Sequence, residues 1–203
     1  GFYGVPNIDV VILYPKRRVS SLQEKQLTTF GNNIHALEVS GSFDDCQKLA
    51  KQALSDRELA AKKMLGSANS INIARLIPQT LYYFYTSKLV SNPLFIVPSG
   101  NFGNITAGLI AQKMGMKCSG FVAATNSNDV VPAYLVSGHY NPRESVQTLS
   151  NAMDVGAPSN MARIQDMAAG EVSTIRKMFT SYAVNDVDTV SSMQELYSDY
   201  NYI

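Results

Sequence analysis

The sequence is poor in the residues that build several common kinds of functional site. It contains no tryptophan, two histidines and two cysteines among 203 residues. A histidine-based zinc site or a serine–histidine triad therefore has few residues to draw on, and we expect no metal site. Cys46 and Cys118 lie far apart and lack metal-ligand spacing, so we expect two free thiols in a reducing cytoplasm.

Long apolar runs and an excess of charge of either sign are also missing. Lysine and arginine number 17 and aspartate and glutamate 16, which gives a formal net charge of +1 at pH 7. This balance offers no argument for nucleic acid or a membrane surface as a partner. No apolar stretch approaches the roughly 20 residues that a membrane-spanning helix needs.

Strands and helices alternate in the first part of the chain. Apolar runs at 9–14 and 34–39 predict strands, and a helical pattern follows each of them. Ser20 or Ser21 begins the first helix, and Ser42, with Asp45 three residues later, predicts a variant of the capping box for the second. This order favours a parallel sheet covered by helices.

The alternation stops near Ser55, and a small polar stretch at 66–72 separates it from the rest. We therefore predict two domains, 1–65 and 66–203. A long apolar and aromatic helix is predicted over 73–89, with Pro78 kinking it or delaying its start.

A strand, a loop and a helix in the middle of the chain give the strongest local signal. The apolar run at 94–97 predicts a strand buried on both faces, and a helix begins near Gly103. In the loop between them, Gly100 and Gly103 can take a positive φ and let another group approach the main chain closely. Free N–H groups at a helix N-terminus can hold a phosphate without a lysine, although an ordinary strand-to-helix turn fits the same composition.

Downstream, a strand at 119–125 is followed by a polar cluster, 125–129, at the strand end where open α/β sheets bind ligands. A helix cap explains Asn128 or Asp129 equally well, and the roles of this cluster and of 148–154 stay open. Further helices are predicted at 130–136, 160–169 (capped by Ser159), 171–179 and 186–197.

The string Ser99-Gly-Asn-Phe-Gly-Asn-Ile-Thr-Ala-Gly108 resembles the phosphate-binding motif of the threonine synthase family. These are pyridoxal-phosphate (PLP) enzymes with the tryptophan-synthase-β-like fold. The resemblance covers essentially the whole chain and includes Ala68-Asn-Ser-Ile-Asn-x-x-Arg75. It implies a three-layer α/β fold with mostly parallel open sheets, in which 1–65 belong to a small mobile domain and 66–203 to the large PLP-binding domain.

The resemblance also implies roles for two loops. The cofactor phosphate would be held by the main-chain amides of Gly100, Asn101, Phe102, Gly103 and Asn104, with side-chain donors from the two asparagines. The phosphate of the substrate O-phosphohomoserine would be held by Ser70, Asn72 and Arg75, the arginine acting as a forked donor. A capped helix, with the arginine paired to a neighbouring carboxylate, is the structural alternative for the second loop.

Enzymes of this family convert O-phosphohomoserine and water to threonine and phosphate, and the resemblance implies that this chain is an internal part of one. Their chemistry needs a Schiff-base lysine, which in the family follows a Phe and precedes an Asp. No lysine of this sequence stands in that context. That lysine is expected upstream of Gly1 and the partner of the pyridine nitrogen beyond Ile203, so we assign no catalytic residue and expect the chain alone to be inactive.

Two alternatives stay open. One is a non-catalytic phosphate- or nucleotide-binding α/β module. The other is a different fold-type II PLP enzyme, such as a serine/threonine dehydratase or a cysteine synthase, since those also carry a glycine-rich phosphate loop. The two motifs together fit threonine synthase better. The oligomeric state is not indicated.

Overall fold

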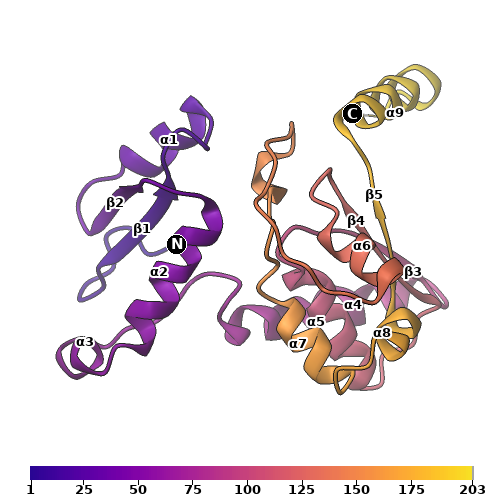
Figure 1. Ribbon diagram of the computed structural model, residues 1–203, viewed down its shortest axis with the longest axis horizontal. Helices are drawn as coiled ribbons and strands as arrows, with labels where there is room; N and C mark the ends of the chain where they lie inside the picture. The colour runs from indigo at the N-terminus through magenta and orange to yellow at the C-terminus, as the bar shows by residue number, and fades with distance from the viewer. Residues whose placement is uncertain (203) are drawn as a thin grey trace. The chain divides into compact units, whose positions relative to one another are not determined.

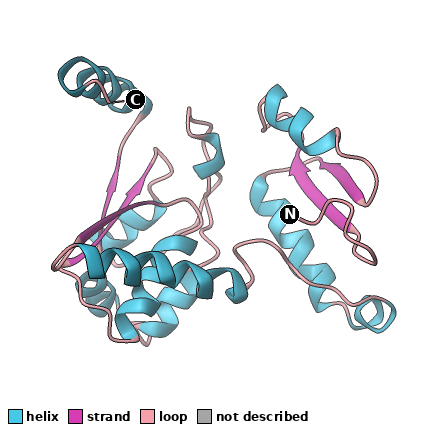
Figure 2. Cartoon of the chain, turned by 180° about the vertical axis from the view of Figure 1, so that it is seen from behind, coloured by secondary structure: helices cyan, strands magenta, loops and turns pink. Residues whose placement is uncertain are grey.

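The computed structural model describes residues 1–202. The chain forms two compact units, Gly1–Ser67 and Ala68–Ile203. Each unit has a parallel sheet of its own, drawn in magenta in Figure 2. The α/β class and the parallel open sheets expected from the sequence are confirmed.

The first unit pairs β1 (Val10–Pro15) with β2 (Ile34–Val39) (Figure 1). Its helices are α1 (Ser21–Thr28), α2 (Phe43–Ser55) and α3 (Arg57–Lys62). The predicted capping box is present, because Ser42 Oγ accepts the Asp45 N–H while the Asp45 carboxylate accepts the Ser42 N–H at 2.7 Å. These two bonds satisfy donors that a helix start leaves without intrahelical partners.

The second unit holds a three-stranded parallel sheet in the order β3-β4-β5. Its strands are β3 (Leu94–Pro98), β4 (Gly120–Thr125) and β5 (Thr180–Ala183). Its helices are α4 (Leu76–Leu89), α5 (Gly103–Lys113), α6 (Val130–Ser137), α7 (Met161–Met167), α8 (Val172–Met178) and α9 (Asp186–Tyr200). Two short 3₁₀ turns, η1 (Ile73–Arg75) and η2 (Asn151–Met153), lie in its loops.

Aromatic rings join the sheet of this unit to α4. Phe95 of β3 and Phe121 of β4 lie 4.8 and 5.8 Å from the ring centroid of Tyr83. Gly108 of α5 packs against two of these rings, since a Cβ there would lie 2.6 Å from Phe121 Cε1 and 2.8 Å from Tyr83 Cε1. Glycine at this position lets α5 approach both α4 and the sheet.

One prediction about the strands was wrong, and one strand was not predicted. β3 is not buried on both faces, because Leu94 and Ile96 are 57% and 67% exposed. In the pairing register Tyr182 of β5 shares this face and is exposed as well, so no element of residues 1–202 covers it there. The short strand β5 was missed, since its four residues carry little apolar pattern and it forms by pairing with β4.

We predict that Gly108→Ala lowers the free energy of unfolding of the second unit by about 1–3 kcal/mol, the usual cost of overpacking a core. Alanine is the better helix former, so in open space this change would stabilise the helix instead. The sign of the change in the free energy of unfolding therefore shows whether Gly108 is closely packed. Urea denaturation followed by circular dichroism measures it, with Gly66→Ala, where a Cβ meets nothing within 4 Å, as the control.

Candidate functional site

The loop between β3 and α5 turns through a left-handed residue. Phe102 has φ 58° and ψ 20°, a conformation that is uncommon for a residue with a side chain and costs free energy. Its ring is only 2% exposed and lies 6.2 Å from the ring of Phe179. Burial of the ring offsets the backbone cost and fixes the shape of the loop.

Main-chain donors of this loop stay without partners. Ser99 still belongs to the sheet, since its N–H donates to Ala124 O at 2.8 Å. From Gly100 to Asn104, no main-chain N–H donates a hydrogen bond to any group within residues 1–202. Five successive amides around a helix start therefore have no acceptor within the described residues, and unpaired N–H groups at a helix start favour a bound phosphate.

The two asparagine side chains of the loop contact neighbouring elements. Asn101 Oδ1 accepts hydrogen bonds from Ser159 N–H and Oγ at 3.1 and 3.2 Å. Asn104 Oδ1 accepts the Tyr83 hydroxyl at 2.6 Å, and its Nδ2 donates to Gln79 Oε1 at 3.0 Å. Burial raises the pKa of Tyr83, so the phenol stays protonated as a donor. These bonds fasten the loop to α4 and to the segment before α7.

The second predicted loop lies beside the first. A Cβ on Gly103 would be 3.6 Å from Ser70 Cβ. Asn72 Oδ1 accepts the Ala74 N–H and caps η1. Arg75 Nη1 donates to Ala68 O, and within residues 1–202 the guanidinium forms no ion pair with a carboxylate. The structure thus brings Ser70 next to the loop at Gly103, while Arg75 keeps most of its donors.

A residue that sequence reasoning missed joins the two loops. Asn160 is fully buried, and its Nδ2 donates to Asn101 O at 3.0 Å and to Ser70 O at 3.4 Å. Arg163 donates from Nη1 to Asn160 Oδ1 and from Nη2 to Ile71 O, both at 2.7 Å. The contacts with Asn101, Ser70 and Ile71 span 59 to 92 positions, so no local motif could have marked them.

The prediction that Ser159 caps the following helix was wrong. That helix, α7, begins at Met161, and no side chain caps its first turn. Ser159 instead donates to the phosphate-loop residue Asn101.

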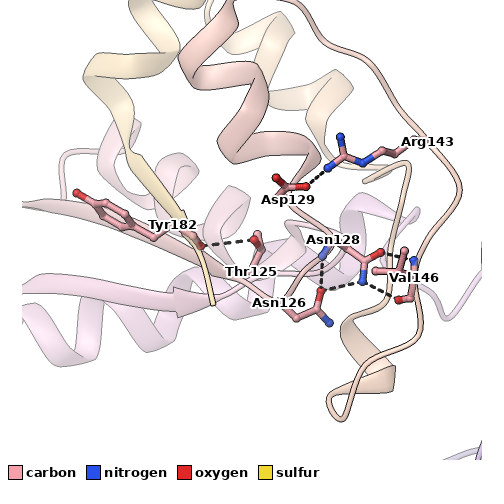
Figure 3. Close-up of polar contacts among 7 residues, drawn as sticks. All are labelled: Thr125, Asn126, Asn128, Asp129, Arg143, Val146 and Tyr182. Carbon is pink, nitrogen blue, oxygen red and sulfur yellow. Dashed lines mark hydrogen bonds and ion pairs between the residues drawn. The ribbon is translucent and has the colours of Figure 1, made fainter. Parts of the chain in front are cut away.

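The polar cluster after β4 fastens a long loop to the sheet. Asn128 Oδ1 accepts the Val146 N–H at 2.8 Å and its Nδ2 donates to Val146 O at 3.0 Å, as Figure 3 shows. Asn126 and Asn128 both donate to Asp154 Oδ1, at 2.9 and 3.2 Å. Asp154 also accepts the Thr148 N–H and hydroxyl. These donors and acceptors satisfy one another and hold 146–154 in place.

Neither Asn128 nor Asp129, the two residues that could cap α6 by the sequence, caps it with its side chain. Asp129 occupies the N-cap position of α6 without a capping hydrogen bond and forms an ion pair with Arg143 (Figure 3). Asn128 is engaged with Asn126, Val146 and Asp154.

Residues 1–202 contain neither a metal site nor a membrane-spanning helix. No three histidine, cysteine, aspartate or glutamate side chains gather there as a metal site would require. No helix in that part of the chain combines the length and the apolar character needed to cross a bilayer.

We predict that Asp154→Ala destabilises the second unit by about 1–3 kcal/mol, because the carboxylate accepts hydrogen bonds from Asn126, Asn128 and Thr148, and the Thr148 N–H loses its acceptor. The loop 146–154 should also become more sensitive to protease. Limited proteolysis with mass spectrometry measures this, and the exposed Asp166→Ala is the control. Equal cleavage rates in the two variants would contradict the assigned role.

No family model matches the chain. Among curated proteins it is 45% identical over 201 residues to the threonine synthase of Buchnera aphidicola, covering 97% of this chain and 47% of that protein. It is 46% identical over 200 residues to the threonine synthase of Escherichia coli and 40% identical over 192 residues to that of Saccharomyces cerevisiae. The chain thus spans about half the length, or less, of these curated relatives.

Solved structures give the same match. The chain superposes on threonine synthase from Escherichia coli with a TM-score of 0.86 at 45% identity, covering 97% of this chain and 47% of that one. For PLP-bound threonine synthase from Brucella melitensis the TM-score is 0.80 at 33% identity, covering 100% and 50%. Maize serine racemase, with a TM-score of 0.67 at 15% identity over 96% of this chain and 55% of that one, shares the fold alone.

Proposed function

This chain is a homologue of the threonine synthases over nearly all of its length, and from that premise we propose that it supplies their two phosphate-binding loops. The complete polypeptide would convert O-phosphohomoserine and water to threonine and phosphate with PLP as cofactor. In this assignment the unit Ala68–Ile203 is part of the PLP-binding domain and the unit Gly1–Ser67 part of the smaller one.

The observation that carries the proposal is the run of unpartnered amides at Gly100 to Asn104. A doubly charged phosphate fits such a run, since each N–H replaces a hydrogen bond from water and the start of α5 adds its partial positive charge. A Cβ on Gly100 would lie 3.0 Å from Met153 Cα and one on Gly103 would lie 3.4 Å from Leu76 Cδ2, so both glycines let the loop pack closely against neighbouring segments. PLP, when bound, would serve as the electron sink for the proton removals.

Ser70, Asn72 and Arg75 would hold the phosphate of the substrate. Arg75 is exposed and uses one of its donors on Ala68 O, which leaves others for a forked contact with a phosphate. Ser70 Oγ donates to Asn69 Oδ1 at 3.0 Å, and the same hydroxyl can rotate to donate to a phosphate oxygen instead. The proximity of Ser70 to Gly103 supports two phosphates bound side by side in one site.

The proposal also concerns the lysine that forms the Schiff base with PLP. No lysine in these residues follows a Phe and precedes an Asp, so we infer that the 203-residue chain alone does not turn over substrate. We place the reaction in the cytoplasm, because Cys46 and Cys118 are both free thiols, as reducing compartments keep them.

The proposal is tested by titrating the complete polypeptide that carries residues 1–203 with PLP and with pyridoxal, which lacks the phosphate. We expect saturable binding of PLP, much weaker binding of pyridoxal, and phosphate release from O-phosphohomoserine. The 203-residue chain should bind PLP weakly and release no phosphate. Equal binding of the two aldehydes, or no turnover by the complete polypeptide, would refute the proposal.

We expect Arg75→Met in the complete polypeptide to raise the KM for O-phosphohomoserine by about tenfold to a hundredfold, the loss of a charge-assisted hydrogen bond. Its affinity for PLP should change little. Steady-state kinetics with parallel PLP titration measure both quantities. Arg57→Met removes an exposed arginine of the other unit and serves as the control.

A further inference from the structure

We propose that Asn160 and Arg163 are positioning residues that hold the cofactor-phosphate loop and the substrate-phosphate loop in one fixed geometry. This inference rests on the proposed function, since it deepens the account of the same site. Neither residue belongs to the two motifs, and neither needs to touch a ligand to have this effect.

The two side chains hold main-chain carbonyls of both loops. Asn160 Nδ2 donates to the carbonyls of Asn101 and Ser70, one in each loop. Arg163 Nη2 donates to the carbonyl of Ile71, one residue further along the second loop. The contact of Arg163 Nη1 with Asn160 Oδ1 locks the two side chains together at 2.7 Å.

Because the peptide bond is planar, a fixed carbonyl oxygen also fixes the direction of the next residue's N–H. In a trans peptide the carbonyl oxygen and the next residue's N–H lie on opposite sides, and no peptide bond in the described chain is cis. Fixing Asn101 O therefore aims the Phe102 N–H away from Asn160. In the same way, the bonds to Ser70 O and Ile71 O orient the N–H groups of Ile71 and Asn72.

Burial restricts the Asn160 side chain. Asn160 is fully buried beneath the start of α5, since a Cβ on Gly103 would lie 3.5 Å from Asn160 Nδ2. A buried amide that uses both its donors and its acceptor has little freedom to rotate, because any other orientation leaves polar atoms unsatisfied. The clamp formed by Asn160 and Arg163 is thus rigid, and so is the spacing of the two loops.

The test replaces Asn160 by a residue of the same shape. In Asn160→Asp the two hydrogen bonds donated by Nδ2 are lost and oxygen faces oxygen, while the main-chain N–H of residue 160 still donates to Asn101 O at 3.3 Å and the contact with Arg163 remains possible. In the complete polypeptide we expect both the Kd for PLP and the KM for O-phosphohomoserine to rise about tenfold. Arg163→Met should raise this KM more than the Kd for PLP, because it releases Ile71 directly, and Arg163→Lys should restore part of the loss.

Arg176 provides a matched control. It too donates two hydrogen bonds to main-chain carbonyls, from Nε to Leu135 O at 2.6 Å and from Nη2 to Val136 O at 3.1 Å. These carbonyls belong to α6, away from both loops. Arg176 is exposed, so Arg176→Met should lower the Tm by no more than Arg163→Met while leaving the Kd for PLP and the KM unchanged.

The outcomes separate this inference from the proposed function. Suppose that the wild type binds PLP and turns over substrate, but that Asn160→Asp and Arg163→Met show the same Kd and KM as the control Arg176→Met. This result would refute the role of Asn160 and Arg163 and leave the proposed function standing. Binding of inorganic phosphate, followed by ³¹P NMR, gives a readout independent of PLP, and the clamp requires weaker binding in both variants. If the wild type binds neither PLP nor inorganic phosphate, both proposals fail. Arg163 is half-buried, so its variants remain informative if Asn160→Asp does not fold.

Discussion

The buried ring of Phe102 holds the chain in a left-handed turn between β3 and α5, and the geometry of both candidate loops depends on it. A right-handed residue at this position would send α5 in another direction and displace Gly103 from Ser70. The conformational cost at Phe102 is local, whereas the packing that offsets it comes from Phe179, far along the chain. The shape of the loop is therefore a property of the whole second unit.

Core packing and polar contacts together determine the position of this loop. Gly108 lets α5 lie close to Tyr83 and Phe121, which sets the position of the helix. The hydrogen bonds of Asn101 and Asn104 to neighbouring elements then set the rotation of its first turn. The side chains are thus used for positioning, while the main-chain N–H groups from Gly100 to Asn104 have no hydrogen-bond acceptor within residues 1–202.

Elements with a clear local pattern were predicted. The strand at 34–39 follows from an apolar run and the capping box of Ser42 and Asp45 from a short-range polar pair, and the structure contains both. The strand β5 depends on pairing with β4, and the exposure of Ile96 depends on which elements cover the sheet. Neither property is encoded in a short window of sequence.

The candidate site shows the same division. Gly100 and Gly103 could be selected because a close approach to the main chain has a local signature. Asn160 could not, because its partners are Asn101 and Ser70, 59 and 90 positions away. An asparagine near the start of a helix is ordinary in sequence, and only its complete burial distinguishes it.

The open face of the second sheet has a practical consequence. Leu94, Ile96 and Tyr182 present apolar surface on an ordered, hydrogen-bonded scaffold. Solvatochromic dyes bind such surface in folded as well as in partly unfolded chains. A bright baseline with such a dye would thus come from the folded 203-residue chain itself, and melting of this chain is better followed through its backbone signal.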